Sequence, residues 1–328
     1  HLGEEDEWQW VRQFARETGL KVTLVGTSPG AYIGDRVYRL AEEAAAEGME
    51  IRPQLAARPT GVLHGLQSSF HVFVGHPTFR AEVAGLPLPE QVAKLRDPAL
   101  RARILAEETQ IPRTVMGRSL EDLLWQVFPL GETPDYEQGR EDSVAGIAEA
   151  EGRSRWAVMY DLLLRDEGRE LFYQPLGGYD AYSLDYYRRV MQMPTALFGL
   201  SDGGAHCGVI ADAGMPSYIL SYWGRDRTRG ETLPLEFLVR KLSRDTAEAY
   251  GMHDRGLLAP GMKADVNVID FDGLRLERPE ASHDLPLGGR RLVQRVEGYR
   301  RIVQGGEITF EDGEHTGARP GRLVRGGR

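Results

Sequence analysis

The sequence predicts an α/β fold, in which helices and strands alternate along the chain, followed by a smaller β-rich segment. Before residue 253, stretches with apolar residues at helical spacing alternate with short apolar runs, a pattern typical of strand–helix–strand units. After that point the pattern stops, and short alternating strands separated by Gly and Pro turns follow. We therefore expect two domains, residues 1–253 and residues 254–328.

The predicted elements at the start of the chain are the most regular. Residues 4–18 carry Trp8, Val11 and Phe14 on one face of a helix, and Gly19 ends that helix. The next segments predict, in order, a strand, a helix and a strand over residues 21–25, 35–47 and 49–56. Because a helix connects the two strands, we expect them to pair in parallel.

The middle of the chain is less regular. Residues 59–89 are rich in Gly and Pro, and we expect them to have loop or short-helix character and to form a lid or binding loop. Three histidines are expected to pack there: His64, His71 and His76. A helix is expected over residues 89–108, with a kink at Pro98. Further helices are expected over residues 142–151, 154–166, 183–193 and 233–252, and strands over residues 123–130, 170–175 and 195–201.

The strand expected at residues 195–201 leads directly into Asp202 and His206 among four glycines. This arrangement is typical of a barrel strand that presents a carboxylate at its carboxyl end, where glycines let the backbone approach a metal or substrate closely. The alternative is an Asp-Gly turn in which Asp202 only accepts hydrogen bonds from nearby backbone amides. Both interpretations remain open from this segment alone.

Composition excludes several classes of protein. The apolar share of 41% and the charged share of 27% are ordinary for a globular domain and exclude a disordered or collagen-like chain. The formal net charge of -9 and the lack of a basic stripe argue against nucleic-acid binding. No apolar run is long enough for a membrane span. The single cysteine, Cys207, cannot form an internal disulfide, so we expect a reducing, cytoplasmic location.

Three separated motifs carry a family resemblance. Residues 201–206 read Ser-Asp-Gly-Gly-Ala-His, residues 256–270 combine a Gly-Pro turn with the start of a strand, and residues 311–323 close the β-rich segment. In this order they resemble the amidohydrolase superfamily, and within it the D-aminoacylase or N-acyl-D-amino-acid deacylase branch. The resemblance extends along nearly the whole chain, including residues 58–61, 95–103 and 223–230.

The resemblance implies the C-terminal part of a distorted (β/α)8 TIM-type barrel, with a metal site at the carboxyl ends of its strands, and a small β-sandwich. It implies that Asp202 binds the metal and takes a proton from the attacking water, with His206 in the same catalytic turn. Zinc is the expected cofactor, as one or two divalent ions, because the family's ligands are nitrogen, sulfur and oxygen atoms. His1 is the other expected ligand, since it matches a family histidine, unless it is foreign to the natural chain.

The sequence also departs from the family. It contains no His-x-His pair, which the family carries on its first barrel strand, and no lysine that matches the carbamylated lysine of other branches. We therefore expect the chain to be the C-terminal part of a longer protein that includes the first barrel strands. A partial barrel has exposed strand edges, so we expect it to pair with another copy or with the missing segment.

Four residues are expected to contact the substrate. Arg58, Arg225 and Arg227 are placed to hold a substrate carboxylate through paired N–H donors. Tyr179 belongs to a Gly-Gly-Tyr loop on the same predicted rim. The alternative for each arginine is an ordinary surface position, and for the tyrosine a rigid aromatic loop.

These observations favour metal-dependent hydrolysis of a linear amide. The expected small-molecule substrate is an N-acyl-amino acid, with the D configuration suggested by the resemblance, and Asp202 is the expected metal ligand and general base. One alternative is a cyclic-amide hydrolase of the hydantoinase or dihydropyrimidinase kind. The other is a catalytically inactive scaffold, which the missing His-x-His pair favours.

Overall fold

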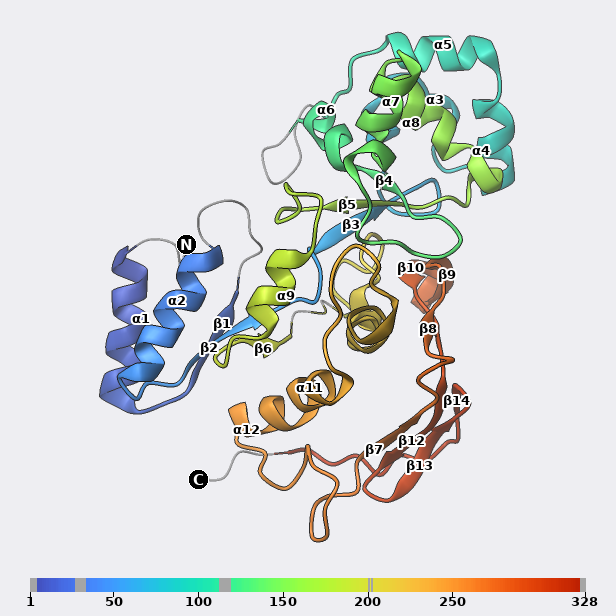
Figure 1. Ribbon diagram of the computed structural model, residues 1–328. Helices are drawn as coiled ribbons and strands as arrows, with labels where there is room; N and C mark the ends of the chain where they lie inside the picture. The colour runs from blue at the N-terminus through green and yellow to red at the C-terminus, as the bar shows by residue number, and fades with distance from the viewer. Residues whose placement is uncertain (1–4, 27–33, 112–118, 200, 202, 325–328) are drawn as a thin grey trace.

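The computed structural model describes residues 5–26, 34–111, 119–199, 201 and 203–324. Figure 1 shows a sheet flanked by α1 (Glu5–Thr18) and α2 (Gly34–Ala46) on the left, a helical region at the top and a β-rich region at the lower right. The chain is therefore mixed α/β, as the sequence predicts. Among the helices of the described ranges, none combines the length and apolarity needed to cross a bilayer.

A parallel sheet forms the part of the molecule next to the N-terminus. It contains β1 (Val22–Val25), β2 (Ile51–Leu55) and β6 (Leu197–Phe198) in the order β1-β2-β6. Both strand pairs are parallel, which confirms the predicted pairing of the first two strands. The core between the sheet and the two helices contains Trp8, Val11, Ala15, Leu24, Val37, Ala44, Met49 and Ile51.

A second, antiparallel sheet lies between the parallel sheet and the helical region (Figure 1). It contains β3 (Gly61–His64), β5 (Phe172–Pro175) and β4 (Phe128–Pro129) in the order β3-β5-β4. The expectation of a long loop over residues 59–89 is therefore wrong in part, because this segment begins with β3. A four-residue strand that opens with glycine is too short to show a period in the sequence.

The helical region has its own apolar core. The expected helix over residues 89–108 is interrupted at Asp97, whose side chain accepts a hydrogen bond from Ala99 N at 2.9 Å and begins a new helix. The expected strand over residues 123–130 is mostly helical turn, and only β4 remains extended. The helices of this region are α3 (Pro77–Glu82), α4 (Leu88–Leu95), α5 (Pro98–Ala106), α6 (Leu120–Leu123), α7 (Val144–Glu151) and α8 (Arg155–Leu163).

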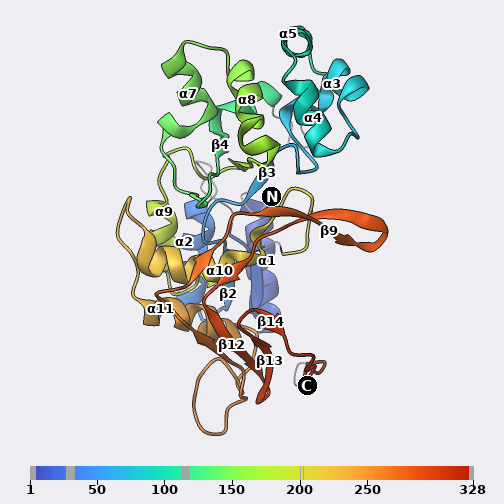
Figure 2. The same cartoon turned by 90° about the vertical axis from the view of Figure 1, so that its right-hand side faces the viewer.

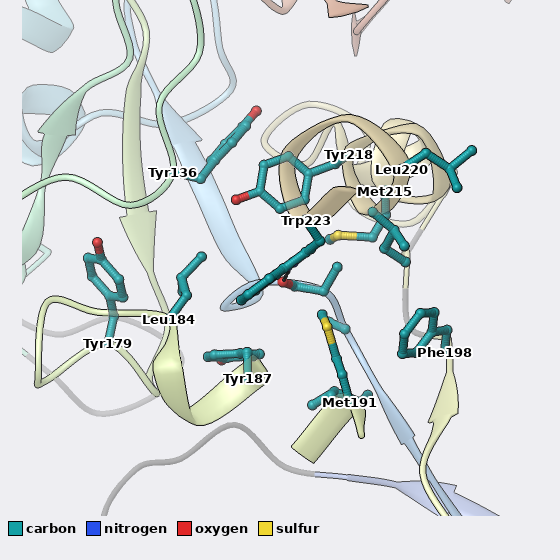
Figure 3. Close-up of a cluster of buried hydrophobic side chains, with 14 of the residues drawn as sticks. Tyr136, Tyr179, Leu184, Tyr187, Met191, Phe198, Met215, Tyr218, Leu220 and Trp223 are labelled. Carbon is teal, nitrogen blue, oxygen red and sulfur yellow. Dashed lines mark hydrogen bonds between the residues drawn. The ribbon is translucent and has the colours of Figure 1, made fainter. Parts of the chain in front are cut away.

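The largest core lies between the two sheets and the helices that precede and follow β6. Figure 3 shows it around Tyr218 and Trp223. The long helix expected over residues 233–252 is confirmed, with a π-helical stretch in its middle. The helical elements around this core are α9 (Asp185–Met191), α10 (Met215–Tyr218), a π-helix (Ile219–Asp226), α11 (Leu235–Arg240), a second π-helix (Lys241–Asp245) and α12 (Thr246–Ala249).

The β-rich segment contains a four-stranded antiparallel sheet and a projecting ribbon (Figure 2). A tight turn at residues 312–313 joins β13 to β14. The strands are β7 (Val266–Ile269), β12 (Tyr299–Gln304), β13 (Glu307–Glu311) and β14 (Glu314–His315) in the sheet, β9 (Glu280–Leu285) and β10 (Gly289–Val293) in the ribbon, and the short pair β8 (Arg275–Leu276) and β11 (Val296–Glu297).

The β-rich segment packs directly on the α/β part. Leu274 and Leu292 are buried in the largest core together with residues of the π-helix. The domain boundary near residue 253 stays a prediction, because the two segments share this core. The partial (β/α)8 barrel also stays a prediction, since the strands of the described ranges form five separate sheets.

Candidate functional site

The candidate site lies at the carboxyl edge of the parallel sheet. Leu55 of β2 pairs with Phe198 of β6, and Gly199 N donates to Leu55 O at 3.0 Å. Because the two strands are parallel neighbours, the segments that follow them leave the sheet at the same edge. Ligands in open α/β sheets bind at this edge. Asp202 follows β6 but lies outside the described residues, so its role as a metal ligand and base stays a prediction.

An ion pair joins the two segments a short way beyond this edge. Arg58 Nη2 donates to Asp212 Oδ1 at 2.6 Å, and both side chains are buried. The guanidinium Cζ lies 3.7 Å from the centre of the Tyr136 ring, with the rings of Tyr173 and Tyr218 at 5.4 and 5.7 Å. Burial acts to lower the pKa of Arg58, but Asp212 and the three phenols outweigh it and raise that pKa. Arg58 therefore stays charged, and it is enclosed by the protein.

The turn that follows residue 202 is held by three backbone hydrogen bonds to other segments. Leu63 N donates to Val209 O at 2.7 Å, Ser69 N to Gly208 O at 2.8 Å and Leu292 N to Cys207 O at 2.6 Å. Residues 207–209 of this turn are therefore hydrogen-bonded to three segments: β3, the residues that follow β3, and β10. His206 itself is exposed and has a left-handed backbone with φ of 44°. The expectation that His206 belongs to this turn agrees with its position, and its catalytic role stays a prediction.

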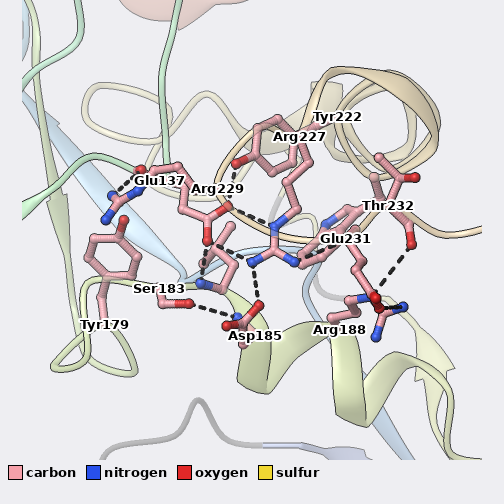
Figure 4. A network of polar contacts seen from close by, with 12 residues as sticks. Glu137, Tyr179, Ser183, Asp185, Arg188, Tyr222, Arg227, Arg229, Glu231 and Thr232 are labelled. Atoms are coloured by element: carbon pink, nitrogen blue, oxygen red, sulfur yellow. Dashed lines mark hydrogen bonds and ion pairs between the residues drawn. The ribbon is translucent and has the colours of Figure 1, made fainter.

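Arg227 is part of a buried polar network (Figure 4). Its Nε donates to Glu137 Oε2 at 2.9 Å and its Nη2 to Glu137 Oε1 at 2.8 Å. Further bonds run from Nη2 to Asp185 Oδ1 at 2.7 Å and from Nη1 to Glu231 O at 3.1 Å. Burial acts to raise the pKa of Glu137, but hydrogen bonds from Arg227, Tyr222 and the backbone of Leu184 outweigh it and lower that pKa. In this arrangement Arg227 binds protein carboxylates.

The other two residues expected to contact substrate are also engaged with the protein. Arg225 donates to the backbone carbonyl of Phe271, to Asp272 O at 3.1 Å and to Leu274 O at 2.7 Å, and so fastens the π-helix to the β-rich segment. Tyr179 is buried, and its hydroxyl donates to Gln138 O at 2.8 Å. Tyr179 and Arg227 thus contact adjacent residues, Gln138 and Glu137. Among the described residues, Arg58 does not contact that segment through a hydrogen bond, and its ion pair is with Asp212.

Three residues of these contacts belong to none of the sequence motifs: Asp212, Glu137 and Tyr136. Asp212 follows two apolar residues within the turn after β6, and this is the only local signal that it points inward. Its partner is 154 residues away in the sequence, so the pairing has no local signature. A cavity of about 300 Å³ lies beside Tyr136 and Tyr218, with Asp135, Ser221 and Arg229 among the polar residues that line it.

The three histidines of residues 59–89 are buried. His64 Nε2 is 2.5 Å from Gln174 Oε1, and His71 Nδ1 accepts from Phe73 N at 3.3 Å. Burial lowers the pKa of His64 to about 4, against the opposing effect of the hydrogen bond that His64 makes to Gln174 Oε1. Burial, and then the charges of His64, His76 and Arg290, lower the pKa of His71 to about 3. This agrees with their interpretation as packing residues.

A metal site cannot be assembled from the described part of the chain. It contains no group of three or more His, Cys, Asp or Glu side chains placed to hold an ion. Both expected ligands, His1 and Asp202, lie outside that part. The zinc cofactor therefore stays a prediction that depends on these two residues and on ligands beyond the described ranges.

The family model described as "Amidohydrolase family" matches residues 2–310. A comparison with curated proteins gave no match. Among solved structures, a D-aminoacylase with a binuclear metal center is 18% identical, with a TM-score of 0.47 over 96% of this chain and 52% of its own. An N-acyl-D-glutamate deacylase from Bordetella bronchiseptica, complexed with zinc and a phosphonate inhibitor, is 19% identical, with a TM-score of 0.48 over 99% of this chain and 54% of its own. The chain spans about half the length of the solved structures it matches.

Proposed function

Because this chain belongs to the amidohydrolase family, we propose that it supplies the carboxyl edge of the active site in an enzyme that hydrolyses linear amides. The observation that supports this most is the path of the chain after β6. After β6 and after β2 the chain leaves the parallel sheet at the same edge, and Ala57 and Ala211 beyond these strands are buried in the same core. Carboxyl ends of neighbouring parallel strands are where such folds place catalytic groups.

We assign Asp202 two roles. As a carboxylate it ligates a divalent ion, with zinc expected, and it accepts the proton that the attacking water loses. When bound, the ion would lower the pKa of that water and polarise the amide carbonyl. His206 is exposed in the same turn, and we assign it a catalytic role beside Asp202. His1 completes the set of ligands proposed from this chain, and the remaining ligands would come from the first strands of a (β/α)8 barrel.

The proposed substrate is an N-acyl-amino acid, with the D configuration as the first choice. A substrate of this kind carries a carboxylate, which needs a cationic group near the site. Arg58, Arg225 and Arg227 each donate to protein groups in the arrangement described. To bind the substrate carboxylate, one of these arginines would therefore have to release a protein group to which it now donates.

The second candidate function is an inactive scaffold of the same fold. It is favoured by one observation, the lack of a His-x-His pair in the sequence. Such a scaffold would bind no stoichiometric metal and would hydrolyse nothing. In that case, replacement of Asp202 changes neither the metal content nor the hydrolytic activity.

The test uses the full-length protein and two variants. Metal content is measured by elemental analysis, and turnover is measured on N-acetyl-D-amino acids, N-acetyl-L-amino acids and hydantoins. The proposed function predicts bound divalent metal, deacylation of N-acetyl-amino acids, and loss of about 10³-fold or more in turnover for Asp202→Asn. Asp254→Asn changes an exposed carboxylate in the turn after α12 and should match the wild type. Ring opening of hydantoins without deacylation would identify a cyclic-amide hydrolase instead, and no metal and no turnover would favour the scaffold.

A further inference from the structure

The described part of the turn, residues 203–211, is flanked on both sides by hydrogen bonds to β2 or to the segment just beyond β2. At its start, Gly199 N donates to Leu55 O, the last residue of β2, at 3.0 Å. At its end, Asp212 Oδ1 accepts a hydrogen bond from Arg58 Nη2 at 2.6 Å, and Arg58 lies three residues beyond the end of β2. The first bond belongs to the sheet, and the second is a side-chain contact between two segments far apart in sequence. The ion pair therefore joins the end of the turn to the segment just beyond β2.

The environment of Arg58 restricts how the side chain can move. The Tyr136 ring lies against the guanidinium at 3.7 Å, and Tyr173 and Tyr218 close the surroundings. Tyr173 is itself fixed, because its hydroxyl donates to Pro59 O at 2.5 Å. Trp223 Nε1 donates to Ala57 O at 2.9 Å and holds the backbone just before Arg58. The cation is therefore held in one position from which it reaches Asp212.

The ion pair of Arg58 and Asp212 is not well suited to stabilise the fold by itself. Arg58 Nε and Asp212 Oδ2 are both buried without a hydrogen-bond partner in the described part of the chain. A buried ion pair recovers its desolvation cost only when its remaining donors and acceptors are satisfied, and apolar residues of similar volume often serve stability better. A buried pair can instead specify one arrangement of the segments that it joins. Here those segments are the exit of β2 and the turn that contains Asp202 and His206.

We propose that Arg58 and Asp212 are positioning residues, which fix the turn containing Asp202 and His206 against the exit of β2. The inference rests on the proposed function only in taking this turn as the reacting one. Arg58 acts through Asp212 and does not contact the substrate. Loss of the pair displaces the turn, and with it the catalytic groups, while the binding of the substrate's remote parts is unchanged.

The first test needs no activity. Three backbone amides report the position of the turn, because they donate to residues 207–209: Leu63, Ser69 and Leu292. In Asp212→Asn, hydrogen exchange at these three amides should become about tenfold faster or more. The amides of α8, which packs in the core of the helical region, should exchange as in the wild type. Asp161→Asn, which removes a partly exposed partner of Arg101, is the matched control and should leave the three amides unchanged.

A second variant covers the case in which Asp212→Asn fails to fold. Asp212→Glu keeps the charge and lengthens the side chain by one methylene, so the turn has to shift to keep the pair. The same three amides should exchange faster, by a smaller factor. Unchanged exchange at these amides in a folded variant overturns the proposal. A uniform increase that includes α8 overturns it as well, because it shows a general loss of stability.

The second test separates positioning from substrate contact. In the full-length protein, Arg58→Lys and Asp212→Asn should both lower kcat about tenfold or more, with KM within about twofold of the wild type. If Arg58 bound the substrate carboxylate, Arg58→Lys would raise KM and Asp212→Asn would not act in the same way. If the wild type hydrolyses no amide, the proposed function fails, and the exchange experiment still decides whether the pair positions the turn.

Discussion

Arg227 and Glu137 form a fully buried ion pair with two hydrogen bonds, at 2.9 and 2.8 Å (Figure 4). The same carboxylate accepts from Leu184 N at 2.7 Å and from the hydroxyl of Tyr222. One carboxylate thus joins the segment before α7, the start of α9 and the end of the π-helix. Both oxygens of the Glu137 carboxylate accept hydrogen bonds, whereas within the described ranges only one oxygen of the Asp212 carboxylate does.

Replacement of Glu137 by glutamine is expected to destabilise the fold by about 3–5 kcal/mol. The change removes the negative charge and leaves the buried Arg227 with only the exposed Asp185 as a charged partner, and the glutamine amide can accept with only one oxygen. Urea unfolding at neutral pH, followed by circular dichroism, measures the difference. As a control, Glu149→Gln removes a carboxylate that pairs with Arg140 at the surface, and its effect should stay within about 1 kcal/mol. Equal effects of the two changes would contradict a structural role for the buried pair.

Trp223→Phe is expected to destabilise the protein by about 1–3 kcal/mol. Phenylalanine retains a ring in the core but lacks the N–H group that donates to Ala57 O at 2.9 Å, so this buried carbonyl loses its partner. The measurement is again urea unfolding. Trp125→Phe is the matched control, because this tryptophan is 41% exposed, and it should change the free energy of unfolding by less than about 1 kcal/mol. A smaller loss at Trp223 than at Trp125 would show that the indole hydrogen bond contributes nothing.

The elements that the sequence predicted correctly are those whose signals are local. The first helix ends at Thr18, and Gly19 follows with a φ of 64°, a backbone conformation that glycine adopts without strain. The break before Pro98 is likewise local, because Asp97 caps the helix that proline begins. Such positions depend on a few neighbouring residues, which the sequence contains in full.

The features that the sequence did not predict depend on distant residues or on ambiguous patterns. The apolar run over residues 123–130 satisfies a buried strand and a buried helical turn equally well, and the contacts of the second core select the turn. Asp212 pairs with Arg58, and Glu137 pairs with Arg227, across 154 and 90 residues. Only the folded chain brings these charges together, so the sequence alone suggested that Arg58 and Arg227 were free for substrate.

Gly61→Ala is expected to destabilise the protein by about 1–3 kcal/mol. A Cβ on this glycine would lie 2.6 Å from Gln174 O, a backbone atom of the paired strand β5 that cannot move without disturbing the sheet. Thermal unfolding measures the difference. Gly321→Ala adds the same methyl group at an exposed position, 3.6 Å from the end of the Gln304 side chain, and should leave the midpoint unchanged. An unchanged midpoint in Gly61→Ala would mean that β3 and β5 do not approach as closely as described.

The buried histidines predict a loss of stability in mild acid. In the folded protein the pKa of His64 is lowered to about 4, whereas an unfolded chain has a histidine pKa of about 6.5. Between these values the unfolded chain binds a proton that the folded chain does not bind, so the free energy of unfolding falls as the pH decreases from 6.5 towards 4. From pH 7 to pH 5 the expected loss is about 2 kcal/mol for His64, and His71, with a pKa of about 3, adds a similar amount.

Urea unfolding at pH 7 and pH 5 tests this prediction, with His64→Gln as the diagnostic variant. Glutamine retains a hydrogen-bonding group next to Gln174 but does not titrate, so the variant should lose about 2 kcal/mol less between the two pH values than the wild type. His253→Gln is the control, because it makes the same substitution at an exposed histidine. If the wild type and His64→Gln lost stability equally, His64 would be protonated in the folded protein, or accessible to water, and its assignment to the packed core would be incorrect.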